Sequence, residues 1–267
     1  MIKKSYDNCP VLYGILYGQG LFILFILFEY FLVSAGISEC GILVDSCIRV
    51  AFGIITLLIM RSIFREEFKK MFTVRITKKT WLCCIPFFLY LVIEFLYLPI
   101  AEKLTTAYVS CFLLACIQQL ATGFWEEAAS KGLGMSGMYS KWRKSFKGRI
   151  GMVVITGALF GTIHIFNVLF TNDISSCLWN ALYASAFGVF LAAIYLQSNS
   201  ITMCMVLHAV WDIVIRIPGN FCENVKDGWV LTFINYSQDI IELGVFPLIA
   251  VLICIKYKRN EEVVKSL

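Results

Sequence analysis

The chain has 267 residues, of which 59% are hydrophobic and 15% charged, with a mean hydropathy of +0.78 and a formal net charge of +5. Soluble globular domains are closer to ~45–50% apolar, so this composition excludes an ordinary soluble domain. The positive charges gather in short segments between apolar stretches, which indicates membrane topology rather than nucleic-acid binding. The expected partner is a lipid bilayer, and no nucleic-acid partner is expected.

About eight apolar segments are long enough to cross a membrane, because ~20 helical residues span the ~30 Å hydrocarbon layer. Lipid cannot satisfy backbone polar groups, so each segment is expected to be a helix. In chain order the predicted spans are residues 11–35, 41–60, 81–101, 104–139, 150–170, 177–196, 201–218 and 239–255. The sequence therefore predicts an all-α, polytopic bundle of about eight transmembrane helices, folded as one integral membrane domain over residues 1–267.

Basic segments predict the orientation of this bundle. Lys and Arg concentrate at the N-terminus, in residues 61–80, in residues 141–149 and in the tail from Lys256. Short basic loops stay in the cytoplasm, and these four segments fall on one side if eight helices alternate across the membrane. The predicted localisation is a multi-pass protein of the cell membrane with cytoplasmic N- and C-termini.

Three polar clusters lie within the apolar segments, and ionisable groups at membrane depth usually mark a functional site. In the first cluster, Glu127 and Lys131 are four residues apart, which suits an ion pair on one helix face. Adjacent helical residues point about 100° apart, so Glu126 can face a pocket and act there as a general base. Alternatively, both glutamates are solvated charges at the cytoplasmic interface, near the basic segment that begins at Lys141.

The second cluster is His164, with Phe160 four residues earlier on the same helix face. The phenyl ring can pack against the imidazole and limit its rotamers. Gly157 and Gly161 form a small-xxx-small pattern, which lets another helix approach closely. Taken alone, a single histidine in an apolar helix is more often a hydrogen-bonded packing residue than a catalytic group.

The third cluster is His208 and Asp212, again four residues apart on one face. An aspartate can accept a hydrogen bond from one imidazole nitrogen and thereby fix the tautomer that the other nitrogen presents. Such a pair suits a proton shuttle, an oxyanion donor or a metal ligand. The alternative is a buried polar pair that only fastens two helices together.

Other polar residues within the spans have simpler interpretations. Asp45 and Arg49 are one turn apart and can pair with each other. Arg216 is expected to anchor its helix by snorkelling to the interface, and Asn167 is expected to hydrogen-bond into the site. Three further acids are expected either to line the same cavity or to lie near helix ends: Glu29, Glu94 and Glu242.

In this order, the three clusters resemble the motifs of the CPBP family of intramembrane endopeptidases (CAAX protease and bacteriocin-processing, or Abi). The family pattern is EExxxR, then FxxxH, then HxxxN or HxxxD. The chain has Glu126-Glu127-x-x-x-Lys131, Phe160-x-x-x-His164 and His208-x-x-x-Asp212. The resemblance covers about residues 115–217, inside a motif-bearing core of about residues 104–218. Lys131 departs from the usual arginine: it keeps the charge but lacks the bidentate fork, so its support of Glu127 could be looser.

The resemblance implies hydrolysis of a peptide bond inside the membrane, near the cytoplasmic face. The active site would lie between the fourth, fifth and seventh predicted helices. The substrate would be a membrane-associated peptide or lipidated protein, either a prenylated CAAX-type C-terminus or a bacteriocin or signal-type leader peptide. The implied catalytic residues are Glu126, Glu127, His164, His208 and Asp212, with Lys131 and Phe160 in support. In these roles Glu126 activates water with the aid of His164, and His208 and Asp212 stabilise the oxyanion.

Two questions stay open at the level of sequence. Family members are often described as metalloproteases, and Glu126, His164 and His208 could hold a zinc ion. The enzyme could equally be glutamate-dependent with no metal, because no HExxH helix is present. The alternative functions are a non-catalytic membrane immunity or scaffold protein that keeps the CPBP fold, and a proton-coupled transporter. A transporter predicts inverted repeats or paired half-helices, and the sequence has no such pattern.

Overall fold

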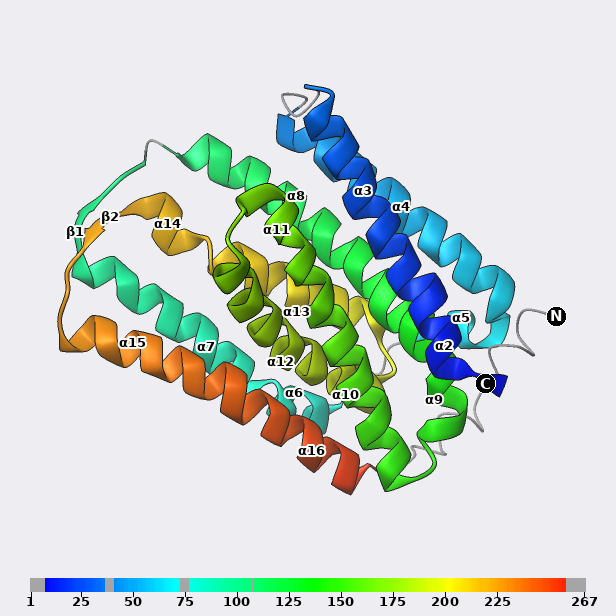
Figure 1. Cartoon of the computed structure of the whole chain (residues 1–267). Helices are drawn as coiled ribbons and strands as arrows, with labels where there is room; N and C mark the ends of the chain where they lie inside the picture. The colour runs from blue at the N-terminus through cyan, green and yellow to red at the C-terminus, as the bar shows by residue number, and fades with distance from the viewer. Residues whose placement is uncertain (1–7, 37–40, 73–76, 107, 258–267) are drawn as a thin grey trace.

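A computed structural model describes residues 8–36, 41–72, 77–106 and 108–257 (Figure 1). The basic residues of the N-terminus and those after residue 257 lie outside these ranges. The elements of the N-terminal half are α2 (Pro10–Gly14), η1 (Ile15–Gln19), α3 (Gly20–Ser34), α4 (Gly41–Ile63), α5 (Arg65–Met71), α6 (Lys78–Cys83), α7 (Ile85–Glu94), η3 (Phe95–Ile100), β1 (Ala101–Leu104), α8 (Val109–Glu127), η4 (Ala128–Met135) and α9 (Ser136–Trp142).

The C-terminal half is helical apart from one short strand, and π-helical or 3-10 segments interrupt both halves. Its elements are α10 (Phe146–Ile163), η5 (His164–Asn167), α11 (Val168–Thr171), α12 (Ile174–Ser198), α13 (Ile201–Val214), α14 (Ile217–Phe221), β2 (Cys222–Val225), α15 (Trp229–Asp239), η6 (Ile240–Val245) and α16 (Phe246–Lys256).

Within the described residues, six helices are long and apolar enough to cross a membrane. They are Pro10–Ser34, Gly41–Ile63, Phe146–Thr171, Ile174–Ser198, Ile201–Phe221 and Trp229–Lys256. The prediction of a multi-pass helical membrane protein is therefore confirmed. The predicted third span is a shorter apolar helix, Ile85–Ile100, and the predicted fourth is the more polar helix formed by α8, η4 and α9. The count of eight spans stays a prediction.

Side-chain caps fix where three of the helices begin. Ser145 accepts a hydrogen bond from the Gly148 amide (3.0 Å) at the start of α10, and Ser200 accepts one from Met203 (3.1 Å) at the start of α13. These contacts satisfy amides that have no partner within a first turn. Asp173 caps α12 in the same way, and this helix ends at Asn199, whose φ of 54° is a left-handed conformation that asparagine tolerates.

One small β-ribbon departs from the all-α expectation. β1 and β2 pair antiparallel, with Ala101 opposite Val225 and Lys103 opposite Glu223. The Lys103 Nζ and Glu223 Oε2 atoms lie 3.2 Å apart across the ribbon. Strand pairing gives the backbone groups beyond the end of η3 hydrogen-bond partners. The ribbon thereby joins the end of η3 to the segment that follows α14.

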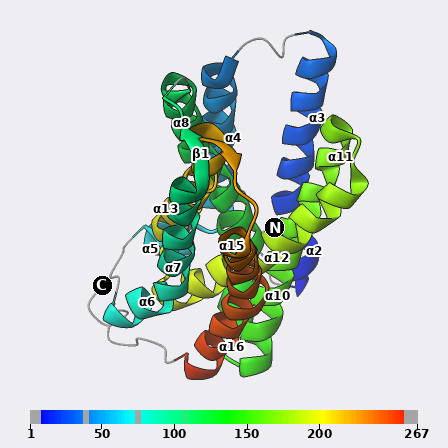
Figure 2. The ribbon, with the colours of Figure 1, turned by 90° about the vertical axis from the view of Figure 1, so that its left-hand side faces the viewer.

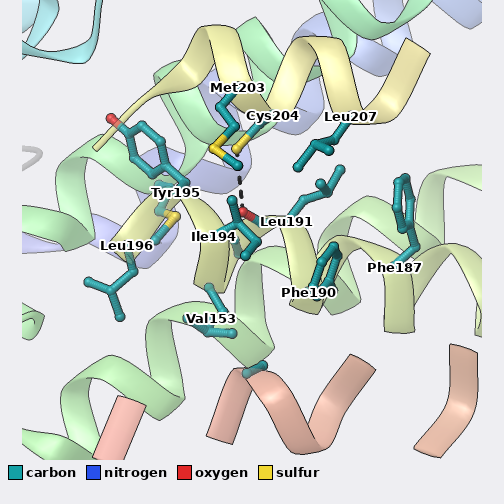
Figure 3. Close-up of a cluster of buried hydrophobic side chains, with 14 of the residues drawn as sticks. Val153, Phe187, Phe190, Leu191, Ile194, Tyr195, Leu196, Met203, Cys204 and Leu207 are labelled. Atoms are coloured by element: carbon teal, nitrogen blue, oxygen red, sulfur yellow. Dashed lines mark hydrogen bonds between the residues drawn. The ribbon is translucent and has the colours of Figure 1, made fainter. Parts of the chain in front are cut away.

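Helix α12 forms the centre of the bundle. In its most apolar window 56% of the residues are buried, against 17% for α4, and its aromatic and aliphatic side chains fill the main core (Figure 3). The thiol of Cys204 on α13 donates to the Leu191 carbonyl at 3.5 Å. Gly157 and Gly161 bring the backbone of α10 against that of α12, since a Cβ on Gly157 would lie 2.8 Å from the Ser185 carbonyl oxygen. This close approach confirms the small-xxx-small prediction.

The described basic segments lie together at the end of the bundle where α5, α6, α9 and the end of α16 lie (Figure 1). Lys79 at the start of α6 donates to the carbonyl of Lys256 at the end of α16 (3.3 Å). Arg149 near the start of α10 donates to the carbonyl of Cys254 (2.8 Å). Asn199 donates to the carbonyl of Lys70 at the end of α5 (3.2 Å). Alternating spans require this arrangement, whereas the assignment of this end to the cytoplasm stays a prediction.

Candidate active site

The three polar clusters meet at one cavity of about 340 Å³. Glu126 reaches it from α8, His164 from the junction of α10 and η5, and His208 and Asp212 from α13. These are the predicted fourth, fifth and seventh spans. The remaining walls come from α3, α4 and α12. Of these helices the sequence indicated only α3, through Glu29. Four polar side chains from three separate helices are thus brought into one cavity.

Glu127 and Lys131 form a fully buried ion pair. The Glu127 Oε1 and Lys131 Nζ atoms lie 2.9 Å apart, and both side chains are 0% exposed. Glu126 is 14% exposed and lines the cavity. The alternative in which both glutamates are solvated interfacial charges is therefore wrong. Lys131 lies in the π-helix η4, which begins directly after Glu127, and π-bulges in α-helices often occur at functional sites.

Phe160, the first residue of the second motif, contacts residues of all three motifs. Its ring lies 4.7 Å from the Lys131 ammonium, a cation–π distance. The ring centroid is 5.2 Å from that of His164 and 5.5 Å from that of His208, which it meets edge-to-face. The Phe160 side chain is 2% exposed. It thus limits the movement of both imidazoles and shields the buried ion pair.

The backbone at His164 helps to fix the tautomer of its ring. Here the α-helix α10 passes into the 3-10 helix η5, and the His164 amide turns to the Gly161 carbonyl. The Phe160 carbonyl then lies 3.1 Å from His164 Nδ1. A carbonyl oxygen only accepts hydrogen bonds, so Nδ1 carries a proton. In the neutral ring, Nε2 therefore has the free lone pair.

His208 is held by carboxylates on both of its nitrogens. Nδ1 lies 3.0 Å from Glu127 Oε1, while Nε2 lies 3.5 Å from Asp212 Oδ2 and 3.9 Å from Glu126 Oε2. The expected neighbour Asp212 therefore lies on the cavity side of the ring. Glu127, on the neighbouring helix α8, orients the other nitrogen, a contact that the sequence did not indicate. One carboxylate thus joins the first motif to the third.

Gln119 and Arg216 extend the site beyond the motifs. With the Gln119 amide oriented by its partners, its nitrogen donates to Asp212 Oδ2 at 3.0 Å. Its oxygen accepts from the Arg216 guanidinium at 3.0 and 3.1 Å. Arg216 therefore lines the cavity and holds Gln119, while its expected role as an interfacial anchor stays a prediction. The spacing of these residues in the sequence could have indicated both. Gln119 precedes Glu126 by seven residues and Arg216 follows Asp212 by four, and helical residues at these separations lie on the same face.

The α3–α4 wall carries a second polar network. Arg49 lies 2.8 Å from both Asp45 and Glu29, and Gln118 donates to Asp45 at 2.6 Å. The predicted Asp45–Arg49 pair is therefore present, and Glu29 lines the cavity, as does Asn167. Glu94 and Glu242 do not line it. Both are buried elsewhere, and Glu94 accepts a hydrogen bond from Gln238 at 2.7 Å.

The arrangement of these side chains does not fit a bound metal ion. Within the described ranges, no three His, Cys, Asp or Glu side chains are grouped as ligands of one ion. Glu126, His164 and His208, the three ligands considered for zinc, share the cavity without forming such a set. A zinc ion needs three or four donors at ~2.0–2.3 Å. The chemistry below is therefore derived from the side chains alone.

Comparison with known protein families identifies the same part of the chain as the site geometry does. Residues 106–214 match the family model described as type II CAAX prenyl endopeptidase Rce1-like. Searches of curated proteins and of solved structures find no match. The matched residues include all three motifs and most of the cavity wall. The segment that carries the candidate active site thus matches the Rce1-like family model of CAAX prenyl endopeptidases, which confirms the resemblance to the CPBP endopeptidases.

Proposed function

We propose that the protein is an intramembrane endopeptidase that hydrolyses a peptide bond of a membrane-associated substrate by glutamate-activated water. The observation that carries this proposal is the convergence of Glu126, His164, His208 and Asp212 on one cavity within the Rce1-like segment. A carboxylate, an imidazole with a free lone pair and a second imidazole with hydrogen-bond donors are the groups that hydrolysis of an amide needs.

Glu126 is the proposed general base. It removes a proton from a water molecule, and the hydroxide attacks the carbonyl carbon of the substrate. His164 Nε2 accepts a hydrogen bond from the same water and orients it. When the tetrahedral intermediate collapses, the C–N bond breaks and the proton held by Glu126 passes to the leaving amine. General acid–base catalysis of this kind contributes about 10²–10⁴-fold.

His208 is the proposed donor to the oxyanion. Its Nε2 is the ring nitrogen near Glu126 and Asp212, so an N–H there points to the side of the cavity where charge develops. Glu127 fixes the ring through Nδ1. Asp212 orients the imidazole from the other side and is itself held by Gln119. A preorganised donor costs no reorganisation during the reaction.

The cavity wall suits a peptide as substrate. Four carboxamide side chains line it, and a carboxamide can both donate to and accept from a peptide backbone, although that of Gln119 is already held by Asp212 and Arg216. The four residues are Gln118, Gln119, Asn167 and Asn180. The family description supports a CAAX-type C-terminus, and a leader peptide anchored in the membrane satisfies the same chemistry.

Cleavage by the full-length protein in detergent tests the proposal. Quenched peptides, one farnesylated and a panel with leader sequences, are incubated with the wild type, Glu126→Ala, His164→Ala and the control Glu66→Gln. Glu66 is an exposed residue of α5 at the basic end. We expect the two site variants to lose cleavage by at least about 10²-fold and the control to keep it. A chelator arm reports whether a metal takes part.

Two outcomes would count against the proposal. Equal cleavage by all four proteins would place the activity in a contaminating protease. Absence of cleavage of every peptide by the wild type would favour the alternative of a non-catalytic immunity or scaffold protein that keeps the fold.

A further inference from the structure

The cavity extends from the motif residues toward one end of the bundle only. Along α8 its lining runs from Glu126 back to Gln118, toward the end where α8 begins. Along α13, which runs the opposite way, it extends forward from His208 to Arg216. α10 and η5 extend it forward again, to Asn167. All three helices therefore lead to the same end, at which α8 begins and α11 lies (Figures 1 and 2).

Exposure rises along this path. His208 is 4% exposed and the Asp212 side chain 20%, while Arg216, two residues beyond the end of α13, is exposed. Asn180, on the α12 wall, is exposed as well. The mouth of the cavity is therefore near Arg216 and Asn180.

The opposite direction is closed by packed side chains. On the side of the Glu127–Lys131 pair that faces the basic end, Leu133 and Met135 are each 0% exposed. The corresponding turns of α13 and α10 are closed in the same way by buried residues, namely Cys204, Ile201, Val153 and Met152. Among the described residues the cavity thus has a floor of apolar core between the candidate site and the basic end.

The two ends differ in charge. The closed end carries Arg61, Arg65, Lys69, Lys70, Lys78, Lys79, Lys141, Arg143, Lys144, Lys147, Arg149 and Lys256, with Glu66 and Glu67 as its described acids. At the open end acids still outnumber bases among the described residues, with Glu102, Asp173, Glu223 and Asp227 against Lys103, Arg216 and Lys226. The Lys and Arg of short loops stay on the cytoplasmic side of a membrane.

We infer that the cavity opens to the extracytoplasmic side, so the substrate is a membrane-anchored polypeptide whose scissile bond is presented outside the cytoplasm. This inference rests on the proposed function and narrows it. It differs from the cleavage near the cytoplasmic face that the family resemblance implies. An exported leader peptide or a membrane-anchored exported protein fits this route, and a prenylated C-terminus made in the cytoplasm does not.

Sidedness of cleavage provides the first test. The full-length protein with a C-terminal epitope tag is prepared in right-side-out and in inside-out vesicles of its expression host, and antibody access to the tag reports the orientation. The probe is the peptide that is cleaved fastest in detergent, made membrane-impermeant with a sulfonated dye. We expect Glu126-dependent cleavage at least about 10-fold faster in right-side-out vesicles, with detergent removing the difference. Faster cleavage in inside-out vesicles would overturn the inference.

A labelling experiment decides the question independently of catalysis. Asn180→Cys at the mouth and Lys147→Cys at the basic end are each treated with an impermeant maleimide, and labelling above that of the parent chain is measured. The inference predicts labelling of Asn180→Cys in right-side-out vesicles and of Lys147→Cys in inside-out vesicles. Labelling of both from the same side would contradict it. If the wild type and Glu126→Ala cleave the peptide equally in detergent, the proposed function is contradicted, whatever the labelling shows. Failure of the proposed function and failure of the inference about the open side are therefore distinguishable.

Discussion

Lys131 shows how one residue stabilises the site without contacting the cavity. Its ammonium pairs with Glu127 and lies over the Phe160 ring, with no exposed area. Glu127 in turn holds His208. Lysine has a single charged nitrogen where the family usually has the guanidinium fork. In this chain, Lys131 and the His208 imidazole both contact Oε1 of Glu127, while Oε2, which a fork could also reach, has no hydrogen-bond partner among the described residues.

Removal of the Lys131 charge should strongly destabilise the protein. Lys131→Met keeps most of the side-chain volume but removes the ammonium from the buried Glu127 carboxylate and leaves it with the His208 imidazole alone. Breaking a buried ion pair in this way costs about 3–5 kcal/mol. The exposed pair of Lys69 and Glu66 provides the matched control, because Lys69→Met should cost less than about 1 kcal/mol. Thermal unfolding in detergent measures both. Adding Glu127→Gln to Lys131→Met should recover part of the loss, and equal melting temperatures for Lys131→Met and the control would refute this account of the pair.

Asp212 should tolerate asparagine but not an apolar residue. Asparagine still offers an oxygen to the Gln119 amide and to His208 Nε2, which lies 3.5 Å away, whereas Asp212→Leu removes both acceptors. We expect Asp212→Asn to keep peptide cleavage within about 10-fold of the wild type and Asp212→Leu to lose about 10²-fold or more. The kcat of purified variants in detergent is the measurement. Equal losses in the two variants would mean that the carboxylate charge itself is needed.

At the scale of elements, the relations within one helix could be predicted and those between helices could not. The pairs Glu127–Lys131 and Asp45–Arg49 follow from the helical repeat, and both are present. The contact of Glu127 with His208 depends on how α8 packs against α13. The change to 3-10 geometry at His164 and the π-helix after Glu127 have no clear sequence signature. Two four-residue strands at the ends of apolar segments are also too short for alternation to reveal.

The close packing of α10 on α12 should be sensitive to a single methyl group. A Cβ on Gly161 would collide with the Ala181 carbonyl and with Ser185, and overpacking of this kind costs about 1–3 kcal/mol. Gly20 in α3 has open space around it, so Gly20→Ala should instead stabilise its helix by about 0.5–1 kcal/mol. Melting temperatures of Gly161→Ala and Gly20→Ala in detergent should therefore move in opposite directions. A neutral Gly161→Ala would show that the two helices can separate freely.

At the scale of the whole molecule, the bundle places polar side chains on one side of a packed floor. α12 supplies the core against which α10, α13 and α16 pack. The α3–α4 pair closes the cavity with the Glu29–Arg49–Asp45 network. Hydropathy alone predicted the membrane class and most spans. The end of the bundle at which the cavity opens could not be predicted. It depends on which part of each motif-bearing helix face the neighbouring helices leave uncovered.

The most direct test of the central claim is a comparison of binding and cleavage in the Glu126→Gln variant. Glutamine keeps the size and polarity of Glu126 but cannot take a proton from water. We predict that in detergent the variant binds the peptide that the wild type cleaves fastest with a Kd within about threefold of the wild-type value. Its single-turnover cleavage rate should fall by at least about 10²-fold. Single-turnover cleavage close to the wild-type rate would show that Glu126 is not the base and would contradict the proposed site.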